Sequence, residues 1–249
     1  LIAIVLGVSF IAGSFIFSDM LRGTFSSIIK GTIPDVSVTK ATNAVTQDGS
    51  ATSSKLNQEL VEKIKRIEGV RQVEGDATGM GVMLIDKQGK ALSSLGPPQL
   101  GLSWGTIPAY GGQQGLTLIS GHEPRSANQV VVDPDSLRKS GYQVGDKAKV
   151  ITPIGTLEVT LVGTGTYGSG GTAGASYTFF TLKQAQQIFL NGQDAFTSIS
   201  IATDKGADRK QVAERVQKIL PTGYDAEDGD TTAKNAEEGI GQALGFVNI

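Results

Sequence analysis

The sequence predicts an α+β fold, in which an α/β unit is split by a β-rich insertion and carries membrane-directed helices at both ends. Three observations predict this arrangement. Strand-like and helix-like patterns alternate within residues 33–88 and again within residues 194–228. Between these ranges, residues 89–193 contain short strand patterns separated by Gly- and Pro-rich turns, which is typical of a β-rich subdomain. The first eighteen residues are apolar, and the last ten become so.

Residues 1–18 predict part of a first transmembrane helix. They carry no charge before Asp19, and as a helix they would be about 27 Å long, close to the hydrocarbon thickness of a bilayer. A buried core helix is the alternative, although core helices usually keep a polar stripe. A secretory signal is disfavoured because no basic residue precedes Arg22. Small residues spaced by four, Ala3 with Gly7 and Ser9 with Gly13, would allow another helix to pack closely.

The chain from residue 19 to residue 88 predicts a stalk helix followed by the first half of the α/β unit. Apolar residues at helical spacing extend the helix over 19–32, where Gly31 and Pro34 end it. A half-buried strand over 35–39 and a polar loop over 41–54 follow. Ser54 is predicted to cap an amphipathic helix that stops at Gly69. Strands are expected at Val70–Glu74 and Gly81–Asp86, so that the helix packs on a sheet.

The predicted insertion consists mainly of short strands. We expect them at residues 116–120, 129–133, 147–152, 156–163 and 177–180, with short helices over 134–140 and after Thr181. The α/β pattern then returns as a strand over 197–203 and a helix that is capped by Asp204 or Asp208 and ended by Pro221. Residues 229–249 begin polar and become apolar from Ile240, which predicts a second stalk that leads into a second transmembrane helix. Residues 19–240 would then lie on the extracytoplasmic side of the membrane, with both ends side by side. Since the chain begins with Leu1, we interpret it as part of a longer protein.

Composition excludes several classes of site. The net charge is −2 and the Lys and Arg residues are scattered, which argues against a nucleic-acid interface. Cysteine is absent, so disulfides, thiolate nucleophiles and Cys-ligated zinc are excluded. His122 is the only histidine and lacks partners for a zinc site or a catalytic triad. We therefore expect no catalytic, cofactor-binding or metal-binding residues.

Three further patterns suggest sites but favour simpler interpretations. Gly163–Gly168 matches G-x-G-x-x-G, yet more glycines follow where a dinucleotide site needs a helix, so a flexible hairpin loop is favoured. An acidic cluster lies near the second stalk, but its spacing does not fit an EF-hand, and a solvated acidic turn is favoured over a Ca²⁺ site. Trp104 and Tyr110 could form a recognition surface, although a plug for a small core is the more common role. The acidic cluster comprises Asp225, Glu227, Asp228 and Asp230.

The order of several short motifs resembles the FtsX-like, MacB-type permeases of ABC transport systems. A strand–helix–strand ends in residues 67–73 (IEGVRQV), and residues 120–124 (SGHEP) lead to residues 129–132 (QVVV). Residues 141–147 (GYQVGDK) then lead to residues 157–163 (LEVTLVG). These resemble the G-x-x-P, V-V-V, x-V-G-D and x-V-x-x-V-G order of that family's MacB-like periplasmic core domain. The loop at 41–54 and the Gly-rich loop at 163–174 have no counterpart in that pattern.

The resemblance implies a non-catalytic, multi-pass membrane protein. Its expected partners are a cytoplasmic ABC ATPase that holds the ATP, a second permease subunit, membrane lipid and an envelope protein, but no nucleic acid. The domain would couple ATP hydrolysis through its stalks to export, lipoprotein release or regulation of an envelope partner. The alternative is a singly anchored extracytoplasmic binding or sensor domain without an ATPase. An anchored enzyme ranks third, because one His, no Cys and no convergent acid–base set disfavour it.

Overall fold

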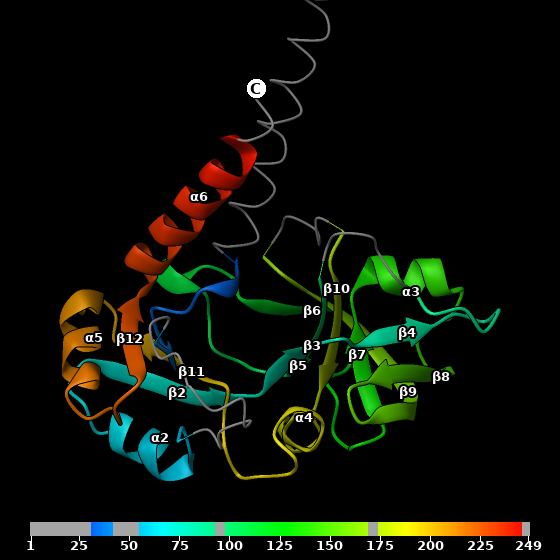
Figure 1. Ribbon diagram of the computed structural model, residues 1–249, viewed down its shortest axis with the longest axis horizontal. Coiled ribbons are helices and arrows are strands. Elements are labelled where there is room, and N and C mark those ends of the chain that lie inside the picture. The colour runs from blue at the N-terminus through cyan, green and yellow to red at the C-terminus, as the bar shows by residue number, and fades with distance from the viewer. Residues whose placement is uncertain (1–30, 42–54, 93–97, 169–173, 246–249) are drawn as a thin grey trace, which may run out of the picture.

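The computed structural model describes residues 31–41, 55–92, 98–168 and 174–245, which form two sheets and their covering helices (Figure 1). The first sheet contains β1 (Val36–Lys40), β2 (Val70–Asp76), β11 (Ser198–Thr203) and β12 (Tyr224–Asp228). Its order is β12-β1-β11-β2, and every pairing is antiparallel. Because its strands come from both ends of the chain, the predicted split of the α/β unit is confirmed.

Strand alternation gives the first sheet one apolar and one polar face. Val36, Val38, Ile199 and Ile201 are buried against helices α2 (Gln58–Ile64) and α5 (Arg209–Gln217). The intervening serines and threonines point to the opposite face, as the period of two in a strand requires. Asp208 caps α5, which is one of the two predicted caps. The cap predicted for α2 is wrong, because Asn57 accepts the capping hydrogen bond.

The second sheet is built from the residues between β2 and β11. Its order is β3-β5-β10-β7-β9-β8-β4, and β6 pairs with β9. The predicted strand over residues 81–86 was assigned to the α/β unit, but β4 pairs with β8 of the second sheet, so that assignment is wrong. The strands are β3 (Thr78–Met80), β4 (Met83–Ile85), β5 (Gln99–Ser103), β6 (Leu116–Gly121), β7 (Gln129–Val132), β8 (Lys147–Thr152), β9 (Gly155–Tyr167) and β10 (Ser176–Phe180).

Short helices accompany the second sheet at the predicted places. Helix α3 (Pro134–Ser140) is capped by Asp133, and α4 (Leu182–Phe189) is capped by Thr181 as predicted. Ala185 and Ile188 of α4 are buried in the apolar core of this sheet. A 3₁₀ turn, η1 (Tyr110–Gly112), lies in the Pro- and Gly-rich segment.

Helix α6 (Gly229–Gly245) begins directly after β12 and rises away from both sheets (Figure 1). A helix was predicted here, and its role as a second stalk stays a prediction. Among the described residues, no helix is long and apolar enough to cross a membrane. The predicted first transmembrane segment, residues 1–18 with their small-residue pairs, and all of the first stalk before Gly31 lie outside the described residues.

Candidate functional site

The base of α6 is where three parts of the chain meet. The backbone N–H of Gly229 donates to the Asp35 carbonyl oxygen at 2.8 Å, and the N–H of Tyr110 donates to the Ile33 carbonyl oxygen at 2.8 Å. The segment entering β1, the start of α6 and the η1 turn are thereby joined. A Cβ on Gly229 would lie 2.7 Å from the Pro34 carbonyl oxygen and 2.7 Å from the Tyr110 Cβ, so only glycine fits this crossing without displacement.

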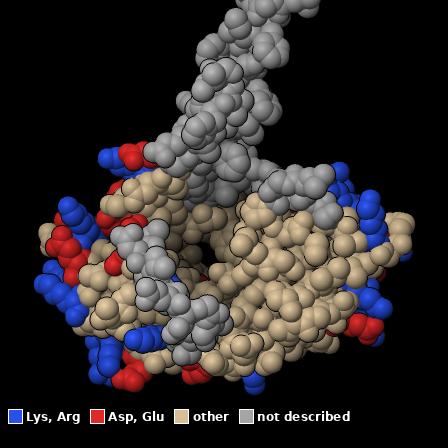
Figure 2. Space-filling view, in the orientation of Figure 1, with Lys and Arg blue, Asp and Glu red and all other residues tan. Residues whose placement is uncertain are grey.

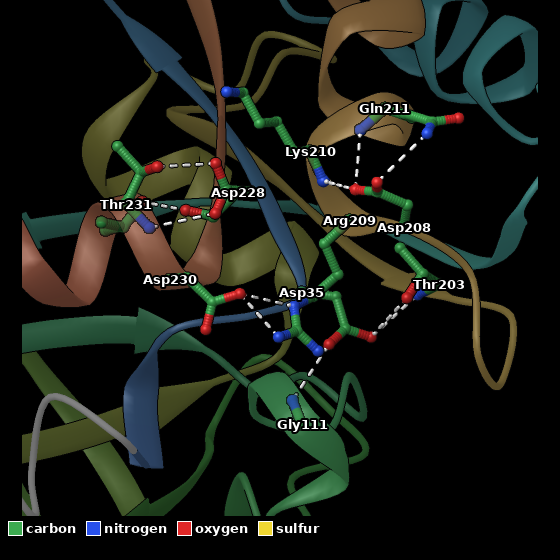
Figure 3. Close-up of polar contacts among 11 residues, drawn as sticks. Asp35, Gly111, Thr203, Asp208, Arg209, Lys210, Gln211, Asp228, Asp230 and Thr231 are labelled. Atoms are coloured by element: carbon green, nitrogen blue, oxygen red, sulfur yellow. Dashed lines mark hydrogen bonds and ion pairs between the residues drawn. The ribbon is translucent and has the colours of Figure 1, made fainter.

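Asp35 lies at the centre of this junction (Figure 3). Asp35 is 7% exposed, and its Oδ2 accepts from the Thr203 N–H at 2.9 Å and the Thr203 hydroxyl at 3.1 Å. Oδ1 accepts from the Gly111 N–H at 3.1 Å. Hydrogen bonds to an ionised acceptor are stronger than neutral ones, and a buried carboxylate requires them. One side chain therefore links β1 and β11 of the first sheet to η1 of the β-rich region.

Arg209, the first residue of α5, connects that helix to α6 (Figure 3). Its guanidinium donates twice to Asp230 Oδ2, from Nε at 3.1 Å and from a terminal nitrogen at 2.6 Å. It also lies over the Tyr110 ring, 5.8 Å from the ring centroid. The hydrogen bond to Asp230 raises the pKa of Arg209 further above its usual value. The cation thus contacts α6 and η1 together.

Asp228 completes the start of α6. Its Oδ1 accepts from the Thr231 N–H at 3.0 Å, and its Oδ2 accepts from the Thr231 hydroxyl at 2.7 Å. Burial opposes ionisation of Asp228, but these hydrogen bonds outweigh it and hold the carboxyl pKa below its usual value. A negative charge directly before the helix also complements the helix dipole. Helix α6 is therefore anchored at its first turn to the edge strand β12.

A cavity of about 410 Å³ lies beside this junction, between the polar face of the first sheet and the second sheet. Figure 2 shows the molecule hollowed between the two sheet-bearing parts. One wall carries the hydroxyls of β1 and β11 and the carboxylates of Glu74 and Asp76 on β2. The other wall carries leucines of β5 and the rings of Tyr167 and Tyr177. Gly31, Thr32 and Pro34, which precede β1, also line the cavity.

The two carboxylates in the cavity differ in their environment. Glu74 Oε2 accepts from the Thr106 N–H at 2.8 Å, and Oε1 accepts from the Thr106 hydroxyl and, at 3.0 Å, from Gln72. Asp76 Oδ2 accepts from the Ser200 hydroxyl at 2.5 Å. Desolvation raises the pKa of Asp76 to about 7, with a smaller contribution from the charge of Glu74, and the Ser200 hydrogen bond partly opposes the rise. Glu74 thus ties the Pro- and Gly-rich segment to the first sheet, while Asp76 Oδ1 has no hydrogen-bond partner among the described residues.

Two of the patterns singled out in the sequence lie in strands. Gly163–Tyr167 belongs to β9 and pairs with β6, so the predicted flexible hairpin loop is wrong for these residues. A Cβ on Gly163 would lie 2.5 Å from the Ser120 carbonyl oxygen, which explains why glycine is needed there. The predicted acidic turn is also wrong, since Asp225, Glu227 and Asp228 lie in β12 and Asp230 lies in α6. Strand alternation places Asp225 and Glu227 on the exposed face of β12 and Asp228 on the opposite, buried face.

The remaining candidates have structural roles. His122 follows β6, and its Nδ1 lies 2.7 Å from the Glu123 carbonyl oxygen. Trp104 packs edge to face on Phe179, with ring centroids 5.7 Å apart, in the small core predicted for it. Over the described ranges, no three His, Asp or Glu side chains cluster closely enough to hold a metal ion.

Sequence patterns did not single out the residues that form the junction and the cavity. Asp35, Arg209 and Asp76 stand in ordinary strand or cap contexts, and their partners are distant in the chain. Asp76 follows the predicted strand Val70–Glu74 and continues the polar alternation of Gln72 and Glu74, so it resembles an ordinary solvent-facing strand residue. This alternation did not indicate which residues would face it.

Comparison with known proteins identifies one family and one fold. The model of the MacB-like periplasmic core domain matches residues 1–219. Among solved structures, the periplasmic region of MacB from Actinobacillus actinomycetemcomitans aligns with a TM-score of 0.56 at 13% identity, covering 84% of this chain and 95% of that one. The extracellular domain of the noncanonic ABC-type transporter YknZ from Gram-positive bacteria aligns with a TM-score of 0.47 at 12% identity, covering 78% of this chain and 99% of that one. No curated protein matches the chain.

Proposed function

The chain belongs to the MacB-like periplasmic core domain family of ABC transporter permeases, and we propose that it transmits motion between its stalks and its extracytoplasmic surface. In this proposal a cytoplasmic ATPase subunit hydrolyses ATP and displaces the stalks. The domain, paired with a second permease subunit and held at the membrane by several helices, relays the displacement. The output is export, lipoprotein release or regulation of an envelope partner, and no residue of this chain takes part in bond chemistry.

The observation that carries the proposal is the attachment of α6 at its base. Asp228 and Gly229 tie the helix to β12 and to the segment before β1, and Asp230 ties it to Arg209 of α5. Tyr110 extends the same contacts to the β-rich region. A change in the direction of α6 would therefore be transmitted to both sheets, because interfaces of this kind switch between packed arrangements and do not deform continuously.

A distance measurement in the reconstituted permease tests the proposal. The chain has no cysteine, so two introduced cysteines carry spin labels without background. One label replaces exposed Lys234 on α6 and the other replaces exposed Lys63 on α2. We expect the distance distribution to differ between the nucleotide-free complex and the complex trapped with ATP and vanadate.

A matched pair within the body of the domain provides the control. Labels at Lys63 on α2 and Lys210 on α5 lie on helices that cover the same sheet face, so their distance should not change with nucleotide. If no ATPase co-purifies with the full-length protein, or if both pairs respond alike, the relay is refuted. The alternative of a singly anchored binding or sensor domain would then take its place.

A further inference from the structure

The cavity beside the stalk base has the walls of a ligand site. Its volume of about 410 Å³ is within the range of small-molecule pockets, about 300–1,000 Å³. It is bounded by both sheets, so a ligand inside would touch both halves of the fold at once. Three residues of the segment entering β1 also line it, which places it against the end of the first stalk.

The first wall is polar and acidic. Hydroxyls of Ser37, Ser198 and Ser200 project from adjacent strands, since Ser37 pairs with Ser200 across β1 and β11. Glu74 and Asp76 stand on the neighbouring strand, where Glu74 pairs with Ser200 and Asp76 with Ser198. The described residues that line the cavity include no Lys, Arg or His, so no cationic side chain in that lining pairs with the two carboxylates.

The contacts of the two carboxylates leave one position available to a ligand. Both oxygens of Glu74 are occupied by Thr106, which fixes that side chain as part of the wall. Asp76 uses only Oδ2, in its hydrogen bond from Ser200. Among the described residues no donor reaches Asp76 Oδ1, which leaves this atom able to accept a hydrogen bond from a bound molecule.

The second wall is apolar and aromatic. Leu100 and Leu102 of β5 and Leu116 of β6 line it together with two tyrosine rings. The rings of Tyr167 and Tyr177 are edge to face, with centroids 5.9 Å apart. Aromatic ring faces attract cations, and leucines accept an apolar body. The two walls together match a molecule that has a positive group at one end and an apolar group at the other.

We propose that this cavity binds a small organic cation, with its ammonium group at Asp76 Oδ1 and its apolar body against Leu100, Leu102 and the tyrosine pair. The inference goes beyond the proposed function, because binding depends only on the walls of the cavity and not on a partner ATPase. A ligand in this place would contact both sheets and the segment entering β1, so it would stabilise one arrangement of the two halves.

Calorimetric titration of the full chain in lipid nanodiscs tests the proposal with a matched pair of probes. Phenethylammonium carries the positive group and an aromatic body, and 2-phenylethanol has the same body with a neutral hydroxyl. We expect phenethylammonium to bind at least about tenfold more tightly than the alcohol, since a hydrogen bond between two charged groups is stronger than one from a neutral hydroxyl. Equal binding of the two probes, or no binding of the ammonium, would overturn the proposal.

Variants locate the binding to this cavity. Asp76→Asn keeps the side-chain volume and an acceptor for Ser200, and we expect it to weaken phenethylammonium binding about tenfold or more. Asp225→Asn is the control, because it removes an exposed carboxylate on β12 that does not line the cavity. Thr39→Trp is a second test of the same site, because the larger side chain on β1 fills the cavity. It should abolish binding of phenethylammonium even if Asp76→Asn folds poorly. Unchanged affinity in Thr39→Trp, or equal losses in Asp76→Asn and Asp225→Asn, would refute the site.

Discussion

Replacing Asp35 by alanine should destabilise the fold more than any surface change at the stalk base. The substitution removes the acceptor for three hydrogen-bond donors and leaves the connection between the two sheets without its central group. Gly111 is exposed, so water can take over its N–H. Thr203 is only 6% exposed, so its N–H and hydroxyl would remain buried without an acceptor.

The magnitude follows from these two buried donors. A buried donor without a partner costs about 1–3 kcal/mol, and the Thr203 hydroxyl can recover part of this by rotating. We therefore expect Asp35→Ala to lower the free energy of unfolding by about 2–4 kcal/mol. Asp35→Asn should cost less, because its one carbonyl oxygen can still accept from Thr203 while only the contact with Gly111 is lost.

Urea unfolding followed by the fluorescence of Trp104 measures this loss. Trp104 is the only tryptophan, and it packs on Phe179 in the β-rich region, away from Asp35 itself. Asp225→Ala is the control, since an exposed carboxylate in the same sheet should change the free energy by no more than about 0.5 kcal/mol. A loss for Asp35→Ala that is no larger than the control would refute the assignment of Asp35 as the centre of the junction.

Three other predictions concern the cavity and the start of α6. The pKa of Asp76 is about 7 in the fold against an ordinary value of 3.8, so the folded chain keeps a proton that the unfolded chain releases between these values. This contribution to stability is present below about pH 4 and is lost as the pH rises toward 7. The urea midpoint of the wild type should therefore fall between pH 5 and pH 8 relative to that of Asp76→Asn. If the midpoints of the two proteins change with pH in parallel, the raised pKa of Asp76 is contradicted. The side chains of Arg209 and Asp230 are 29% and 61% exposed, so water screens the attraction between their charges. A double-mutant cycle on thermal unfolding should therefore give a coupling energy of less than about 1 kcal/mol. A coupling energy of several kcal/mol would contradict this screening by solvent. Gly229→Ala places a methyl group 2.7 Å from backbone and ring atoms, so it should lower the unfolding free energy by about 1–3 kcal/mol in the same urea assay, whereas Lys234→Ala on the exposed part of α6 should not.

The sequence by itself predicted the elements whose signals are local. Valines that alternate with Ser and Thr indicated β1, and isoleucines that alternate with Ser indicated β11. Thr181 predicted the start of α4, and Asp204 or Asp208 predicted the start of α5, because a cap and the first turn it satisfies lie within a few residues. The return of an α/β pattern after the β-rich stretch predicted the split fold, since strands from both ends must pair in one sheet.

The tertiary structure decided the features that depend on partners distant in the chain. Residues 224–228 resemble a polar turn in sequence, and only pairing with β1 makes them a strand. In sequence, Gly163 resembles part of a nucleotide-binding loop. The structure shows that glycine is needed there because the Ser120 carbonyl oxygen approaches its backbone closely. The polar face of β1, β2 and β11 was visible as alternation, but alternation does not indicate what a face meets. The junction at Asp35 and the cavity at Asp76 exist because the fold brings a second sheet onto that face, and their chemistry depends on that contact.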